Sequence, residues 1–126
     1  MNVPAELKYT KDHEWLKVEG NIGIIGITDY AQGELGDVVF IDINPDLAEI
    51  KVGEAFGTIE AVKTVSDLYA PVDGKITELN KKLNDEPQLV NSDPYGEGWL
   101  AKIEITNPSQ VNDLLDSAAY EAQLGQ

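Results

Sequence analysis

The sequence predicts a mainly β fold, a sandwich or barrel to which a few helices are added. Short runs of strand-favouring residues recur through most of the chain, with turn residues between them about every 8 to 12 positions. A long amphipathic helix pattern occurs only near the C-terminal end. With 126 residues and 42% hydrophobic content, the chain can bury one core. We therefore expect a single domain over residues 1–126, with its β core at about residues 13–105.

Turn residues separate the predicted strands. Gly20-Asn21 joins the first two strands in a hairpin, and Asn44-Pro45-Asp46 ends a later strand. Pro71-Val72-Asp73-Gly74 is a strong turn, so we expect two hairpins, one at Lys63 and one at Asp73. The expected strands are residues 13–19, 22–27, 38–43, 55–60, 64–70, 75–79 and 99–105. The aromatic residues expected in the core or at its edge are Trp15, Phe40, Phe56 and Trp99.

A short helix is expected near residues 28–35. Thr28-Asp29 provides an N-cap, and Gln32 stands where a capping box on Asp29 requires it. Two nearby glycines limit this helix to two turns at most.

The last third of the sequence predicts a loop and a terminal helix. Residues 80–98 contain prolines and glycines at turn positions, and we expect a surface loop with at most one helical turn. Asn107 as N-cap and Pro108 at the first helical position predict a C-terminal helix at about residues 108–123. Its apolar stripe would consist of Val111, Leu114, Leu115, Ala118 and Ala122.

Composition excludes several classes of function. The formal net charge of −14, from 23 acidic and nine basic residues, argues against nucleic acid and anionic membranes as partners. There is no cysteine and only one histidine, His13, which we expect to be a packed or hydrogen-bonded structural residue and not a metal ligand. Neither a phosphate-binding glycine loop nor a catalytic motif is present. We expect a cytoplasmic protein, because no targeting or membrane-spanning segment is evident. We also expect a monomer.

The informative stretch surrounds Lys63. The chain should reverse at Val62-Lys63, so that the lysine projects from a hairpin tip. Gly57 and Glu60 precede it by six and three residues, and Pro71 and Gly74 follow it by eight and eleven. This pattern resembles the lipoyl and biotinyl attachment domains, in which a modified lysine lies on a β-hairpin. The resemblance implies the flattened barrel-sandwich hybrid fold of that superfamily.

Further residues narrow the resemblance. The biotinyl branch usually has methionines beside its lysine, whereas Val62 and Thr64 stand here. The segment Glu60-Ala61-Val62-Lys63 instead resembles the glycine cleavage system H proteins. The likeness covers nearly the whole chain and extends to His13-Glu14-Trp15, Ile25-Gly26-Ile27-Thr28, Leu35-Gly36-Asp37-Val38-Val39-Phe40, Asn91-Ser92-Asp93-Pro94-Tyr95 and Gly98-Trp99.

This resemblance implies a non-catalytic carrier with lipoate attached to Lys63 as N6-lipoyllysine. The carrier would take an aminomethyl group from a pyridoxal-phosphate glycine decarboxylase to an aminomethyltransferase, and dihydrolipoyl dehydrogenase would then reoxidise it. Lipoylating enzymes would be further partners. The family pattern places carboxylates that contact the loaded arm at Glu14 and Asp67, and Asp12 stands where some relatives have serine. Glu60 would contribute to recognition of the modification site.

Three other functions remain open on the sequence alone. The chain could be a lipoyl relay protein that supplies 2-oxoacid dehydrogenases, with glycine chemistry secondary or absent. It could be a biotin carboxyl carrier. It could also be an unmodified β-rich interaction module, in which Lys63 would be an ordinary surface lysine.

Overall fold

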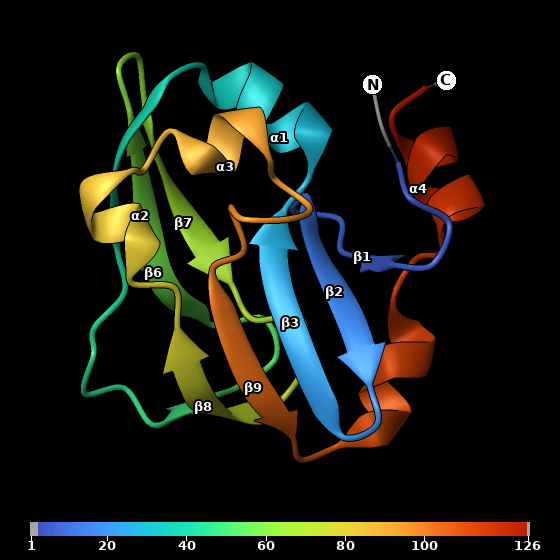
Figure 1. The fold of residues 1–126 in the computed structure, drawn as a ribbon. Helices are drawn as coiled ribbons and strands as arrows, with labels where there is room; N and C mark the ends of the chain where they lie inside the picture. Colours follow the sequence, from blue (N-terminus) through green and yellow to red (C-terminus); the bar gives the residue numbers. More distant parts are fainter. Residues whose placement is uncertain (1–2, 126) are drawn as a thin grey trace.

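Two β-sheets form most of the computed structural model, which describes residues 3–125 (Figure 1). The larger sheet has the strand order β1-β2-β3-β9-β8-β5, the smaller has the order β4-β6-β7, and all pairings are antiparallel. The strands are β1 Lys8–Tyr9, β2 Glu14–Glu19, β3 Ile22–Ile27, β4 Val38–Asp42, β5 Glu49–Ile50, β6 Ala55–Ala61, β7 Val65–Tyr69, β8 Gly74–Leu79 and β9 Ala101–Ile105. The mainly β, two-sheet fold is therefore confirmed.

The main hydrophobic core draws on both sheets. In β9, Ala101, Ile103 and Ile105 are buried whereas Glu104 is exposed, as expected for a strand with one face on the core. Ile59 of β6 and Leu68 of β7 contribute from the smaller sheet. Trp15 and Phe56 are buried as expected, but Phe40 is 46% exposed, so its expected core position is wrong.

The predicted short helix is present as α1, Asp29–Leu35. Its N-cap is Thr28, whose Oγ1 accepts a hydrogen bond from the backbone N–H of Ala31. Asp29 instead accepts a bond from the side chain of Gln32, 2.7 Å away.

Residues 80–98 are more ordered than expected. They contain α2, Lys82–Asp85, and α3, Leu89–Ser92, and the three helices α1 to α3 gather at one end of the sheets (Figure 1). The expected surface loop with at most one helical turn is wrong, because Leu83 and Val90 are buried and their segment covers the end of the core. The side chain of Asn91 bonds to the Gly36 carbonyl and the Val38 amide, which ties α3 to the connection between α1 and β4.

The turn after Ala70 joins the two sheets. β7 pairs with β6 in the smaller sheet, whereas β8 pairs with β5 and β9 in the larger sheet. The expected hairpin at Asp73 is therefore wrong. Pro71 and Val72 are buried where the chain passes from one sheet to the other, and Asp73 accepts a bond from the Val52 amide through its side chain.

The C-terminal segment is divided into two helices. A 3-10 helix, η1 Pro108–Asp113, and an α-helix, α4 Ser117–Gln123, replace the single helix expected over residues 108–123. Between them Leu115 and Tyr9 exchange two backbone hydrogen bonds of 2.8 Å, which require extended backbone, and Asp116 then caps α4. The predicted C-terminal helix exists in this shorter form.

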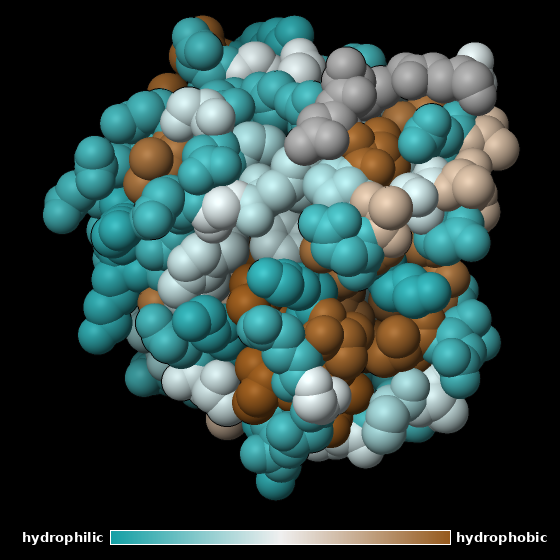
Figure 2. Space-filling model, turned by 45° about the vertical axis from the view of Figure 1, so that its right-hand side comes forward, coloured by the Kyte–Doolittle hydropathy of each residue, from teal (hydrophilic) through white to brown (hydrophobic). Residues whose placement is uncertain are grey.

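A second hydrophobic cluster lies under this segment. Tyr120 of α4 stacks on Tyr9 with ring centroids 4.7 Å apart, and both belong to a cluster with Leu7 and Trp15. Figure 2, turned toward this side, shows hydrophobic residues gathered beside largely hydrophilic surface. Within residues 3–125, no helix has the length and apolar character required to cross a membrane.

Gly26 tests the packing of the second cluster. It pairs with Trp15 across β2 and β3, and a Cβ at Gly26 would overlap the Trp15 indole. Gly26→Ala should lower the free energy of unfolding by about 2 to 3 kcal/mol, measured by urea denaturation. Gly33→Ala is the control, because a Cβ at Gly33 meets no atom within 4 Å. In α1 it should raise stability by roughly 0.5 to 1 kcal/mol. Equal effects of the two substitutions would contradict this account.

Candidate functional site

Lys63 lies at the tip of the hairpin formed by β6 and β7, as expected. The Ala61 N–H donates to the Thr64 carbonyl at 2.8 Å and closes the turn. The Val62 N–H donates to the Asp37 carbonyl at 2.9 Å and ties the tip to the connection between α1 and β4. Figure 1 shows the tip rising beside α1. Lys63 is therefore exposed on a turn that is fixed from within and from outside the hairpin.

The stem of Lys63 lies over Gly36, the residue that ends α1. A Cβ at Gly36 would stand 3.3 Å from Cε of Lys63, and the φ of +75° at Gly36 is one that glycine adopts without strain. The lysine side chain therefore passes across the C-terminal end of α1.

A cleft of about 290 Å³ brings together the three carboxylates expected at the site. Asp12 lies in the turn before β2, Glu14 is the first residue of β2, and Asp67 comes from β7. Apolar side chains such as Ile27 and Leu68 line its interior. Within residues 3–125, no three His, Asp or Glu side chains converge as ligands for a metal ion.

Glu14 is the buried carboxylate of the cleft. It is only 2% exposed, and it accepts hydrogen bonds from Thr10 Oγ1 at 2.7 Å and from the Tyr69 N–H at 3.2 Å. Burial raises its pKa to about 7, against the opposite effect of these two hydrogen bonds. Glu14 therefore stands near the midpoint of its titration at neutral pH, in a place where an added positive charge would favour the carboxylate form.

Asp12 and Asp67 are the exposed carboxylates of the cleft. The Asp12 N–H donates to Thr10 Oγ1 at 3.2 Å, which orders the turn before β2. The hydroxyl of Tyr69 lies 3.5 Å from Asp67, and the charge of Asp67 raises the pKa of Tyr69. The cleft thus offers two solvated anions and one buried carboxyl group.

His13, between Asp12 and Glu14, contacts the C-terminal helix α4. Its φ is +70°, and its Nδ1 lies 2.8 Å from the Tyr120 hydroxyl. That hydroxyl also lies 2.7 Å from Thr28 Oγ1 at the start of α1. Burial lowers the pKa of His13. It is a hydrogen-bonded structural residue, as expected.

Two residues of α1 that were not expected at the site, Tyr30 and Glu34, also line the cleft. They are four positions apart and so share a helix face, and the charge of Glu34 raises the pKa of Tyr30. An acidic residue one turn after an aromatic residue on a predicted helix was the available signal. Glu60 does not line the cleft. It lies exposed on the outer face of the smaller sheet, between Phe40 and Val65 in the strand register.

The cleft lies within reach of a long arm on Lys63. Asp67 follows Lys63 by four positions, which in extended chain is a distance of roughly 13 Å at about 3.3 Å per residue. A lysine stem that carries an eight-carbon acyl chain has about ten successive single bonds of roughly 1.5 Å, which gives a comparable reach. The exposed lysine at the hairpin tip, its distance from the cleft and the carboxylates of the cleft together fit a flexible arm with a cationic end.

Comparisons with known proteins agree in both sequence and structure. The family model described as "Glycine cleavage H-protein" matches residues 7–126. The glycine cleavage system H protein of Symbiobacterium thermophilum is 59% identical over 121 residues, which cover 96% of this chain and 94% of that protein. The H protein of Staphylococcus haemolyticus is 53% identical over 126 residues, the full length of both chains. The crystal structure of a Mycobacterium marinum glycine cleavage system H protein superimposes with a TM-score of 0.89 at 38% identity, covering 98% of this chain and 100% of that chain.

The raised pKa of Glu14 predicts a pH-dependent stability. Between the ordinary glutamate pKa of 4.5 and the folded-state pKa of about 7, the folded protein binds more of this proton than the unfolded chain does. Stability therefore falls as the pH rises through this window, by up to about 1.4 kcal/mol per pH unit. Glu14→Gln lacks this titrating group. The free energy of unfolding of the variant minus that of the wild type should therefore increase from pH 5 to pH 7 and stay constant at higher pH.

Chemical denaturation at a series of pH values measures this difference. Glu19→Gln, which replaces an exposed residue of the same strand, is the control and should follow the wild type. Parallel pH profiles for Glu14→Gln and the wild type would show that Glu14 titrates normally.

Proposed function

This chain belongs to the glycine cleavage H-protein family, and we propose that Lys63 is the residue to which its lipoyl group is attached. As a member of this family, the protein is a lipoyl carrier and a non-catalytic subunit of the glycine cleavage system. The observation that carries the proposal is the position of Lys63, exposed at a closed hairpin tip with its stem directed over α1.

Attachment requires an amine that an acylating enzyme can surround. Only the free-base form of a lysine amine is a nucleophile, so an activated acyl donor must capture that form. Amide formation then removes the positive charge of Lys63. When bound, the lipoyl group supplies a disulfide that accepts the one-carbon cargo and a dithiol that is later reoxidised.

The proposed partners are the other proteins of the system. They are the pyridoxal-phosphate glycine decarboxylase, the aminomethyltransferase and dihydrolipoyl dehydrogenase, together with the lipoylating enzymes. Lys63 would have to enter each active site in turn. Its exposure on a narrow tip supports such a role, because the tip can enter a cleft that the rest of the domain cannot.

The cleft carboxylates would hold the loaded arm between these visits. Its terminal amine is cationic, and Glu14, Asp67 and Asp12 can accept charge-assisted hydrogen bonds from it. Glu14 would provide the buried contact, because water competes least for a group that is 2% exposed. Ile27 and Leu68 would exclude water from the stem of the arm.

Glu60 would act at an earlier stage, in recognition by the lipoylating enzyme. It stands three residues before Lys63 and is exposed on the outer face of the smaller sheet. Its separation from the cleft supports a role in attachment and not in cargo protection.

Lys63→Arg tests the attachment site. The variant should retain the wild-type unfolding midpoint, because the side chain is exposed, and should show no lipoyl mass increment and no glycine-dependent CO2 exchange. Intact mass and the exchange assay with the partner decarboxylase measure the two effects. Lys17→Arg, at another exposed lysine, is the control and should behave as wild type. A lipoyl increment on the Lys63→Arg variant would place the attachment elsewhere, and a lipoylated wild type without exchange activity would favour the relay function.

Asp67→Asn tests the cleft. Removal of one carboxylate should shorten the lifetime of the aminomethyl-loaded carrier severalfold, measured as release of formaldehyde and ammonia after removal of the decarboxylase. Asp12→Asn should have the same direction of effect. Asp85→Asn, at an exposed position of α2, is the control. Equal lifetimes in all three variants would show that the cleft does not protect the cargo.

A further inference from the structure

Exposed hydrophobic side chains concentrate around Lys63. Six large hydrophobic residues are exposed among the described residues, and four of them lie at this end of the smaller sheet. They are Val39, Phe40, Val62 and Val65, with exposed fractions of 51%, 46%, 75% and 61%. We call these four residues the apolar collar. Exposed apolar residues that cluster on a chain with a net charge of −14 indicate a site that binds a partner, because contact with water does not favour such a cluster.

The strand register explains how the collar is assembled. The pairing of β4 with β6 is irregular between Val38 and Phe40, so that the two consecutive residues Val39 and Phe40 are both exposed. Phe40 is level with Glu60, and Glu60 is level with Val65. Val62 joins this group through the hydrogen bond of its N–H to Asp37.

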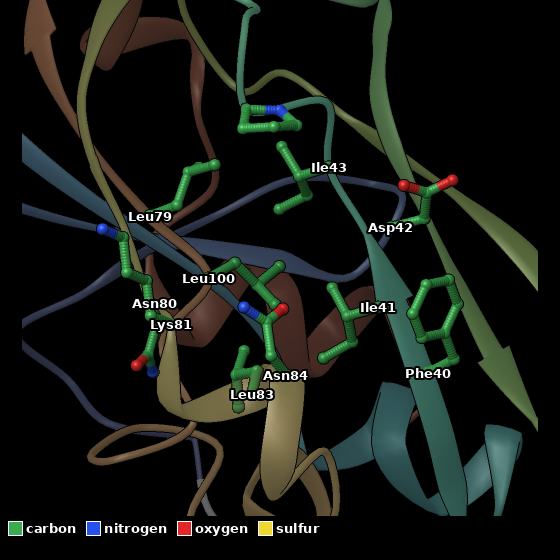
Figure 3. Close-up of a pocket in the computed structure, with 11 residues that line it drawn as sticks. Phe40, Ile41, Asp42, Ile43, Leu79, Asn80, Lys81, Leu83, Asn84 and Leu100 are labelled. Carbon is green, nitrogen blue, oxygen red and sulfur yellow. The ribbon is translucent and has the colours of Figure 1, made fainter.

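Phe40 is exposed on the outer face and also lies at the edge of a neighbouring groove. That groove, of about 290 Å³, lies between β4, β8 and α2. Figure 3 shows Ile41 and Ile43 directed into it, toward Leu100 and Leu79, whereas Phe40 and Asp42, which line its edge, point away from these side chains. The exposed ring of Phe40 therefore lies on the outer face of the smaller sheet, level with Glu60 of β6.

The charge around the collar is of one sign. Residues 29–44 and 54–70, which form α1 and the smaller sheet with its connections, contain seven acidic residues and one basic residue, Lys63 itself. Glu34, Asp37 and Glu60 are exposed near the tip. A partner that covers the collar must therefore carry basic residues around an apolar depression.

We propose that the apolar collar is the docking surface for the enzyme that acylates Lys63, and that this enzyme presents an apolar rim flanked by basic residues. The inference rests on the proposed attachment at Lys63. In the step itself, the free-base amine attacks the carbonyl carbon of an activated lipoyl donor. The amide C–N bond forms, the bond to the leaving group breaks, and the proton of the amine passes to an enzyme base or to water.

The short lysine stem favours the acylating enzyme as the partner of the collar over the enzymes that use the lipoylated arm. Before modification the amine stands on four methylenes, roughly 6 Å from the backbone. An active site that receives it must therefore contact the residues beside Lys63. Enzymes that use the finished arm receive its far end, beyond an additional eight-carbon chain, and can act with the collar at a greater distance.

The double variant Val62→Ser/Val65→Ser tests the proposal. Its kcat/KM for acylation by a lipoate ligase, followed by intact mass with lipoate and ATP, should fall about tenfold, the effect expected when an apolar side chain no longer fills a complementary pocket. Once fully lipoylated by prolonged incubation, the variant should be reoxidised by dihydrolipoyl dehydrogenase within about twofold of the wild-type rate, because that enzyme receives the far end of the arm. The wild-type acylation rate should also decrease as salt is added.

Val18→Ser is the matched control, because Val18 is 40% exposed on β2 of the other sheet. It should be acylated at the wild-type rate. Wild-type rates for the collar variant would overturn the inference and leave the attachment site intact, whereas an unmodified wild-type protein would refute the attachment itself. A stable dimer of the unmodified protein in sedimentation experiments, abolished in the collar variant, would instead identify the collar as an interface between copies and overturn the inference.

Discussion

The hydrogen bond from the Val62 amide to the Asp37 carbonyl is the contact on which the arrangement of the site depends. It joins the tip of the hairpin to the connection that leaves α1, and Asn91 fixes the same connection from α3. A free hairpin tip would move with its own local fluctuations. Here the tip is tied to the connection that follows α1, and α1 also lines the cleft, so contacts outside the hairpin set the position of Lys63 relative to the cleft.

The cleft combines features that oppose each other energetically. Glu14 is buried at the cost of desolvation, which its hydrogen bonds from Thr10 and Tyr69 offset only in part. Asp12 and Asp67 remain in water and cost little. A site made only of exposed carboxylates would bind a cation weakly, because water and salt screen it. In the proposed arm-binding role, Glu14 would supply the stronger contact, and Asp12 and Asp67 would attract the cation at longer range.

Local patterns predicted most strands and α1, because alternation and capping depend on neighbouring residues. The same reasoning missed β1 and β5, which at two residues each are too short to alternate. It also joined η1 to α4, because the helical stripe continues through Leu115, whereas backbone pairing with Tyr9 decides the local structure. The grouping of Asp12, Glu14 and Asp67 followed from family resemblance alone. Spacing cannot show it, since it depends on how two sheets face each other.

The raised pKa of Glu14 affects the exchange of a proton between the cleft and solvent. At neutral pH an empty cleft retains this proton for part of the time. If the proposed arm binds there, its cationic end would displace this proton, so binding would be coupled to proton release. In the proposed arm-binding role, a cationic group and a proton would therefore compete for the carboxylate of Glu14.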